Sequence, residues 1–207
     1  MNLLVTGFEP FAGSSVNPSQ QIAAALAEAR FDGVRICTAI LPVDGAAAPA
    51  AAIAALQRHA PDVVICLGQA TGRSVISLER VAINLLDYGI PDNTGRLVVD
   101  EPVVAGGPAA YFTTLPVRDM LAAIRATGVP AELSLSAGAY LCNQVMYAVL
   151  HHSAVHALPV RAGFVHVPPL PEQAASHPRP QPSMSLETMV KGVSAAILAL
   201  TTKGAPA

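Results

Sequence analysis

The chain has 207 residues, of which 52% are hydrophobic and 13% charged, and its formal net charge is −2. It has no basic stripe, which argues against nucleic acid as the main partner. Its apolar runs are broken well before the roughly 20 residues that span a bilayer, which argues against a membrane protein. The three cysteines, Cys37, Cys66 and Cys142, are widely spaced and odd in number. They predict neither a disulfide framework nor a metal pair, and they favour a reducing cytoplasm.

The first half of the chain alternates between strand-like and helix-like segments. Strands are predicted at residues 3–6, 34–41 and 63–68, where apolar runs end in Gly or Pro. The first of these strands ends at Gly7 and lacks a basic flank, so it does not resemble a signal peptide. Asn17 before Pro18 indicates a helix start and predicts a helix to Arg30. Asp44 is expected to cap a second helix, which ends near His59.

The second half continues this alternation after an interruption. Residues 75–85 contain a strand-like run, and residues 87–108 carry strong turn signals. We interpret 87–108 as an excursion from the core, with a short edge strand at 97–99. The remaining predictions are a helix at 115–127, a strand at 131–136, a helix at 143–151, a strand at 161–167, a proline-rich irregular loop at 168–182 and a helix from Ser185 to Thr202.

This alternation predicts one domain over residues 1–207, with a three-layer α/β/α fold and a mostly parallel sheet. Ligand sites in such sheets lie beyond the carboxyl ends of the strands. The turn at residues 7–13, Gln69 and Cys142 each follow a predicted strand. We therefore expect them to meet at one edge of the sheet.

Cys142 is the strongest candidate for chemistry. A small-residue turn at 136–140 leads into it, and a helix is predicted directly after it. Unpaired N–H groups and the positive end of the helix dipole would favour a thiolate there, and a thiolate is the reactive nucleophile. The alternative is a buried apolar cysteine, which is what we expect of Cys37 and Cys66.

A cysteine nucleophile needs a base and a group that orients the base. Among the histidines, His166 ends a predicted strand and is expected at the same sheet edge as Cys142, whereas His151 and His152 lie at the far end of the predicted helix. Glu79 is an orienting candidate, because a carboxylate in an apolar context needs a partner. The alternative for Glu79 is a structural ion pair with Arg80.

Several motifs together resemble one family, the pyroglutamyl-peptidase I (pyrrolidone-carboxylate peptidase) family. They are GFEPF at 7–11 with NPS at 17–19, LERVAIN at 78–84, IPDN at 90–93 and SAGAYLCN at 136–143. Their order and spacing hold over nearly the whole chain. The resemblance implies a Cys–His–Glu triad at Cys142, His166 and Glu79, an α/β/α fold, a cytosolic enzyme without metal or cofactor, and commonly a homotetramer.

The implied reaction is hydrolysis of the amide bond after an N-terminal pyroglutamyl residue. The pyroglutamyl ring is a neutral lactam, so its site should offer apolar walls and amide partners. The expected walls are Phe8, Phe11, Ile90 and Tyr140, and the expected amide partners are Gln69 and Asn17. Alternatively, the two phenylalanines are core residues and Asn17 only caps its helix. Backbone N–H groups at Cys142 are expected to bind the oxyanion.

One departure from the family pattern affects this prediction. Asp87-Tyr88-Gly89 stands where the family usually has Asp-Ala-Arg, so an expected arginine is absent at position 89. Tyr140 also stands where relatives often have Phe. A non-catalytic relative that binds pyroglutamyl peptides therefore remains an alternative. A nucleoside phosphorylase-like enzyme is a second alternative, although no P-loop or GxGxxG follows any predicted strand.

Overall fold

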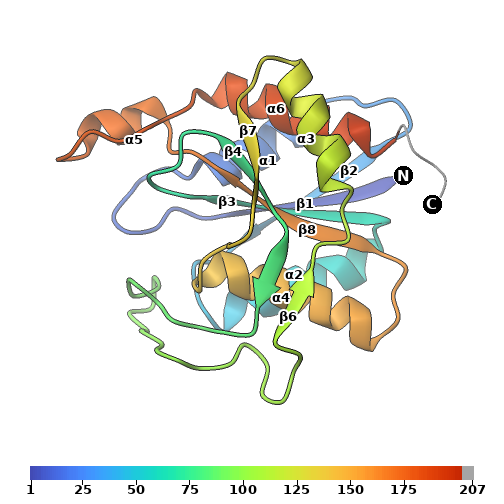
Figure 1. Ribbon diagram of the computed structural model, residues 1–207, viewed down its shortest axis with the longest axis vertical. Coiled ribbons are helices and arrows are strands. Elements are labelled where there is room, and N and C mark those ends of the chain that lie inside the picture. Colours follow the sequence, from blue (N-terminus) through green and yellow to red (C-terminus); the bar gives the residue numbers. More distant parts are fainter. Residues whose placement is uncertain (202–207) are drawn as a thin grey trace.

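The computed structural model describes residues 1–201, so the predicted helix end at Thr202 lies outside the described residues. The strands are β1 (Asn2–Phe8), β2 (Arg35–Leu41), β3 (Val63–Gln69), β4 (Ile76–Glu79), β5 (Val81–Ile83), β6 (Ala110–Phe112), β7 (Ala131–Ser134) and β8 (Arg161–Val167). The helices are α1 (Pro18–Glu28), α2 (Ala47–His59), α3 (Val117–Ala126), α4 (Leu141–Val155), α5 (Pro171–Ser176) and α6 (Leu186–Ala199). Figure 1 shows their arrangement.

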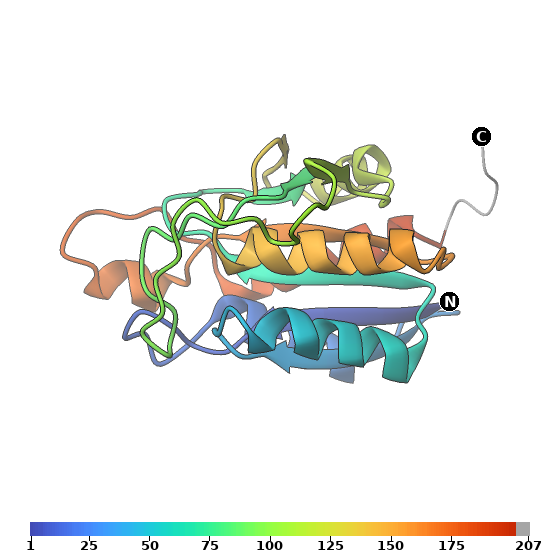
Figure 2. The ribbon, with the colours of Figure 1, turned by 90° about the horizontal axis from the view of Figure 1, so that it is seen from below.

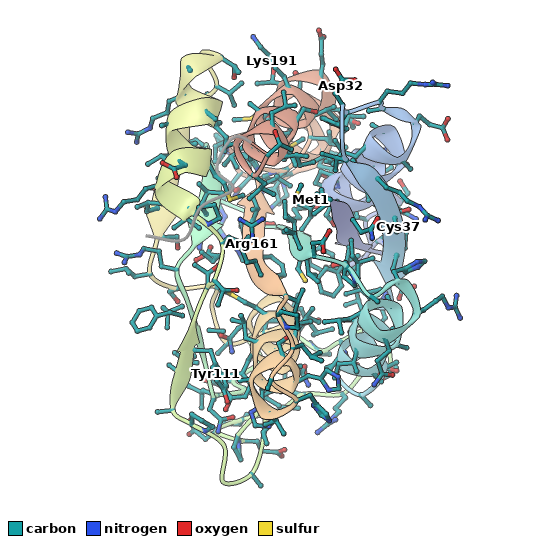
Figure 3. The ribbon with its side chains drawn as sticks, turned by 90° about the vertical axis from the view of Figure 1, so that its right-hand side faces the viewer. Met1, Asp32, Cys37, Tyr111, Arg161 and Lys191 are labelled. Atoms are coloured by element: carbon teal, nitrogen blue, oxygen red, sulfur yellow. The ribbon has the colours of Figure 1, made fainter. Side chains whose placement is uncertain are left out.

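A six-stranded sheet with the order β2-β1-β3-β8-β4-β7 forms the centre of the fold. Its strand pairs are parallel except for β4 with β8, which is antiparallel. Helices α1, α3 and α6 cover one face, and α2 and α4 cover the other (Figures 1 and 3). The predicted three-layer α/β/α fold with a mostly parallel sheet is confirmed.

The two faces of β3 supply the two hydrophobic cores. Val63, Ile65 and Leu67 pack on the side of α1, α3 and α6, whereas Val64 and Cys66 pack on the side of α2 and α4. This alternation is the period of two expected of a strand that is buried on both faces. Cys66 is therefore a core residue, as predicted.

Side-chain caps begin several of the helices, as the sequence indicates. Asn17 accepts a hydrogen bond from the Ser19 N–H at the start of α1, and Ser185 does the same for Thr188 at α6. Asp44 accepts from the N–H groups of Ala46 and Ala47 at the start of α2. In contrast, no side chain caps α4, so the N–H groups of its first turn have no side-chain acceptor at the N-cap.

Two local predictions are wrong. Residues 97–99 form no strand; β5 pairs instead with β6 as a separate antiparallel ribbon, and an isolated bridge joins Leu86 to Glu101. The Val98 carbonyl accepts from the Tyr88 N–H, and Leu86 and Glu101 exchange backbone hydrogen bonds, but these contacts form no continuous ladder at 97–99. The proline-rich segment 168–182 is not wholly irregular, because Pro171 occupies the first turn of α5, a position that proline tolerates.

The route of the chain to Cys142 also differs from the prediction. β7 is parallel to β4 and therefore antiparallel to β8, so its carboxyl end does not point to the edge where β8 ends. Residues 135–140 return the chain to that edge, and α4 begins there. In Figure 1 the carboxyl ends of β1, β3 and β8 point to the left, toward α5, and Figure 2 shows the connecting loops gathered at the same end.

Candidate active site

A cavity of about 230 Å³ lies at this edge of the sheet. The carboxyl ends of β1, β3 and β8, the loops after them and the start of α4 enclose it. Its lining residues are Phe8, Phe11, Asn17, Val43, Gln69, Thr71, Ala137, Tyr140, Leu141, Cys142 and His166. Cys142 and His166 therefore share one cavity, although 23 residues of sequence, including the rest of α4, separate them (residues 143–165).

Cys142 lies in the first turn of α4, whose preceding residue Tyr140 has an extended backbone. Gly68 on β3 makes room for the sulfur: a Cβ on Gly68 would lie 2.8 Å from Cys142 Sγ and 2.7 Å from Phe164 Cζ. Both distances are too short for a contact between a Cβ atom and a non-bonded heavy atom. The strand thus approaches the sulfur so closely that only glycine fits at this position.

Burial governs the protonation of Cys142. It raises the pKa of the thiol to about 12, the negative charge of Glu79 adds to the increase, and Arg73 opposes it. The helix terminus is present as predicted and favours a thiolate, whereas burial of the thiol opposes it by raising the pKa.

His166 is a buried residue near the end of β8, and Glu79 is a fully buried residue at the end of β4. His166 Nδ1 lies 2.8 Å from Glu79 Oε1. Burial lowers the pKa of His166, and the hydrogen bond to Glu79 only partly offsets this. Burial would raise the pKa of Glu79, but the hydrogen bond from His166, with help from the positive charge of Arg73, lowers it. The carboxylate is thus ionised beside a neutral imidazole.

Arg73 completes this cluster and was not identified from the sequence. Its Nη1 lies 2.6 Å from Glu79 Oε1, and its Nη2 donates to the carbonyl of Ser136 in the turn before α4. Glu79 therefore pairs with Arg73 and His166, and the predicted alternative of a Glu79–Arg80 ion pair does not form. Arg73 lies in an irregular loop six residues before Glu79, where no periodic pattern indicates the direction of a side chain.

Three of the four residues predicted as apolar walls border the cavity. Phe8, Phe11 and Tyr140 line the cavity, and Tyr140 donates a hydrogen bond to the carbonyl of Pro91. Ile90, the fourth predicted wall, does not line the cavity, and its side chain is 42% exposed. The carbonyl of Pro91 and the side chains of Asp92 and Asn93 hold the turn at 90–93 in place, and the Ile90 side chain is left on the outside.

The two predicted amide partners differ in what they can offer a ligand. Asn17 Oδ1 accepts from the N–H and the hydroxyl of Ser19, and its Nδ2 donates to the carbonyl of Glu9. Asn17 thus caps α1, as its alternative interpretation states, and also closes the loop between β1 and α1. Gln69 Nε2 lies 3.5 Å from Thr71 Oγ1, a weak contact, and therefore remains available as a donor.

Several lining residues were missed, namely Val43, Thr71, Ala137 and Leu141. They come from loops and from the first turn of a helix, where the sequence shows which residues are apolar but not which cavity they enclose. Gly89 is exposed, and a Cβ there would meet nothing within 4 Å.

The arrangement can carry out acyl transfer through a thiol. It has a cysteine at an uncapped helix start, a histidine held by a carboxylate, and a cavity whose other lining residues carry no charge. No group of three or more metal-binding side chains occurs within residues 1–201. In the same range, no helix reaches the length and apolar character needed to cross a bilayer. Fold and site together define the class: a cysteine hydrolase built on an α/β sheet.

Comparison with known proteins gives the family. The model of the pyroglutamyl peptidase family matches residues 1–203. The pyrrolidone-carboxylate peptidase of Gloeobacter violaceus is 50% identical over 193 residues, which cover 93% of each chain. The structure of a mutant pyrrolidone carboxyl peptidase from the hyperthermophile Pyrococcus furiosus superposes with a TM-score of 0.93 at 44% identity and covers 97% of this chain and 98% of its own.

Pyroglutamyl peptidase I of Bacillus amyloliquefaciens has a TM-score of 0.92 at 38% identity, covering 96% of this chain and 95% of its own. The chain therefore belongs to the pyroglutamyl peptidase family of cysteine peptidases. The alternative of a nucleoside phosphorylase-like enzyme is thereby excluded.

The raised pKa of Cys142 predicts its reactivity in the free protein. Because the thiol stays protonated, its alkylation by iodoacetamide should still accelerate at pH 9, with no plateau at neutral pH. The rate is measured by mass spectrometry of the peptide that contains Cys142, which separates it from reaction at the partly exposed Cys37. A plateau below pH 7 would reveal a resting thiolate and contradict this assignment.

Proposed function

We propose that this protein hydrolyses the amide bond after an N-terminal pyroglutamyl residue, with Cys142 as nucleophile, His166 as general base and acid, and Glu79 as the residue that orients His166. The observation that carries the proposal is the shared cavity of Cys142 and His166, together with the 2.8 Å contact between His166 and Glu79. The relatives named as pyrrolidone-carboxylate peptidases supply the substrate class.

The histidine tautomer determines how the proton moves. A carboxylate only accepts hydrogen bonds, so the Nδ1 of neutral His166 carries the proton and donates it to Glu79. Nε2 is then the free acceptor. As Cys142 Sγ attacks the carbonyl carbon, its proton passes to Nε2, and the carbonyl π electrons move to oxygen. Collapse of the intermediate breaks the C–N bond, and His166 gives this proton to the leaving amine.

Hydrolysis of the thioester completes the cycle. His166 takes a proton from water, hydroxide adds to the acyl carbon, and the Cys142 sulfur leaves and recovers the proton. Free pyroglutamate departs. The first N–H groups of α4 are suited to bind the oxyanion in both steps, because no side chain caps that helix. Gly89 has no side chain, so we assign the stabilisation of the oxyanion to these backbone donors.

The cavity chemistry favours a neutral ring. No carboxylate lines it, so it offers nothing to hold the α-ammonium of an ordinary N-terminus. Phe8, Phe11 and Tyr140 provide flat apolar walls, and Gln69 provides an amide donor for the lactam carbonyl. A bound prolyl ring would cover this donor without offering it an oxygen, and the unpaired donor would disfavour that ring.

We further propose a cytoplasmic homotetramer. Support for association comes from large apolar side chains that are exposed in the single chain. They are Ile40, Ile90, Leu97, Val99, Phe112, Leu135, Val155 and Leu198. Contact between copies would remove part of this surface from water. Three free cysteines fit a reducing compartment.

The first test compares pyroglutamyl and prolyl amides that release the same fluorophore. We expect thiol-dependent turnover of the pyroglutamyl amide and a kcat/KM at least roughly 10²-fold lower for the prolyl amide. Cys142→Ala should lower kcat by about 10⁴-fold or more. Full activity of Cys142→Ala would refute the mechanism, and an inactive wild type would favour the alternative of a non-catalytic relative.

The second test concerns His166. The pKa of His166 in the folded protein lies below the ordinary histidine value of about 6.5, so the imidazole is still neutral at pH 6.5. The value of kcat/KM should therefore stay constant as pH falls past 6.5 and decline only in more acidic solution. Glu79→Gln removes the charge that raises the pKa of His166, so the decline should move to still lower pH. The maximal rate of this variant should fall by roughly 10³-fold. An acid limb above pH 6.5 in the wild type would contradict the assignment.

The third test uses the close approach of β3. Gly68→Ala should displace Cys142 Sγ and lower kcat/KM by roughly 10²-fold, because small displacements of reacting groups have large effects on rate. Gly89→Ala is the matched control, since its added carbon meets nothing within 4 Å. Equal activities of the two folded variants would show that the space at Gly68 is not needed.

A further inference from the structure

Gln173 connects three segments that surround the cavity. It lies on α5, beside the carboxyl ends of the central strands (Figure 1). Its amide group contacts Leu170 before α5, Ser14 and Val16 in the loop between β1 and α1, and Gln69 at the end of β3. Gln173 itself does not line the catalytic cavity, whereas Gln69 does.

Backbone groups determine which way the Gln173 amide faces. Its Oε1 accepts a hydrogen bond of 2.8 Å from the Leu170 N–H, which can only donate. Its Nε2 lies 3.2 Å from the carbonyl oxygen of Val16, which can only accept. A reversed amide would place two donors together on one side and two acceptors on the other. The orientation of Gln173 is therefore defined at both ends by groups that cannot change their role.

This orientation determines that of Gln69. Nε2 of Gln173 lies 3.1 Å from Oε1 of Gln69, so a donor faces this side of the Gln69 amide. The oxygen of Gln69 must then point to Gln173, because two NH₂ groups would repel each other. The NH₂ group of Gln69 is left on the other side, near Thr71, where both residues line the cavity.

The other amide in the cavity cannot replace this donor. Asn17 uses its oxygen for Ser19 and directs its NH₂ group to the carbonyl of Glu9. The Gln69 NH₂ group has only the weak 3.5 Å contact with Thr71. It is thus the amide donor that the lining residues leave available to a carbonyl in the cavity.

We propose that Gln173 is a positioning residue: through the hydrogen bond from its Nε2 to Gln69 Oε1, it holds the NH₂ group of Gln69 toward the lactam carbonyl of the substrate. This inference rests on the proposed pyroglutamyl peptidase function. It assigns part of the selectivity for pyroglutamate to a residue on α5 that does not line the cavity.

Gln173→Glu is the informative substitution, because it keeps the shape of the side chain. The new carboxylate still accepts from the Leu170 N–H, but it faces the oxygen of Gln69 without a donor. Gln69 then turns its NH₂ group toward the carboxylate and its oxygen toward the cavity. For the pyroglutamyl amide we expect KM to rise by roughly 10²-fold with kcat little changed, since the lactam carbonyl is remote from the scissile bond. The preference over the prolyl amide should fall accordingly.

A double-mutant cycle separates positioning from a merely structural role. Gln69→Leu removes the donor itself, so Gln173→Glu should have no further effect on KM in that background. Independent effects that add in the double variant would overturn the inference. Glu172→Gln, on the neighbouring exposed residue of α5, is the control for a change of charge and should match the wild type.

Acid solution provides a second readout. Protonation of the introduced carboxyl restores an O–H donor toward Gln69, so the KM of Gln173→Glu relative to wild type should improve as pH falls. A constant ratio would contradict the proposal. Thermal unfolding of each variant verifies that it is folded. An inactive wild type would refute the proposed function, whereas an active wild type with additive effects would refute only the role of Gln173.

Discussion

The buried hydrogen bond between His166 Nδ1 and Glu79 Oε1 is the interaction on which the site depends. It is made by two neighbouring antiparallel strands, β8 and β4. In their register His166 lies opposite Ser77, and Glu79 lies opposite Phe164. Ser77 and Glu79 are two residues apart and share a face of the strand, so Glu79 is the diagonal neighbour of His166 and within reach of its ring. A shift of one residue would send the two side chains to opposite faces.

The partners of Glu79 also explain why the burial of its carboxylate is tolerated. A fully buried carboxylate without partners would be costly, and both Arg73 and His166 lie within hydrogen-bond distance of it. Arg73 in addition binds the carbonyl of Ser136, so the same cation connects Glu79 to the turn that precedes Cys142. The catalytic groups proposed here are thus joined through charge and hydrogen bonds as well as through the sheet. Because burial raises the pKa of its thiol, Cys142 needs a neutral histidine to accept its proton.

Much of the fold could be predicted from the sequence, because it depends on local patterns. The apolar runs of β1, β3 and β8 and the caps of α1 and α6 are visible in short windows of the chain. The position of Cys142 at a helix start is visible in the same way. The path that brings Cys142 to the sheet edge cannot be predicted from such windows. It depends on β4 and β7 running antiparallel to β8, which is a property of the whole sheet.

The parts of the site that could not be predicted lie in loops. The sequence indicates that Ile90 is apolar, but the turn directs it outward while Tyr140 binds the backbone of Pro91. It indicates that Glu79 needs a partner, yet the partner is Arg73 and not the adjacent Arg80. The contact of Gln173 with Gln69 spans 104 positions of sequence and follows no motif spacing.

The most direct test of the central claim is to identify the acylated residue. A pyroglutamyl ester that acylates the enzyme faster than the acyl group is hydrolysed is mixed with the protein, quenched in acid and analysed by peptide mass spectrometry. One pyroglutamyl group should be found on the peptide that contains Cys142. An acyl group on another residue, or steady hydrolysis of the ester while Cys142 stays unmodified throughout, would contradict the assignment of Cys142 as the nucleophile.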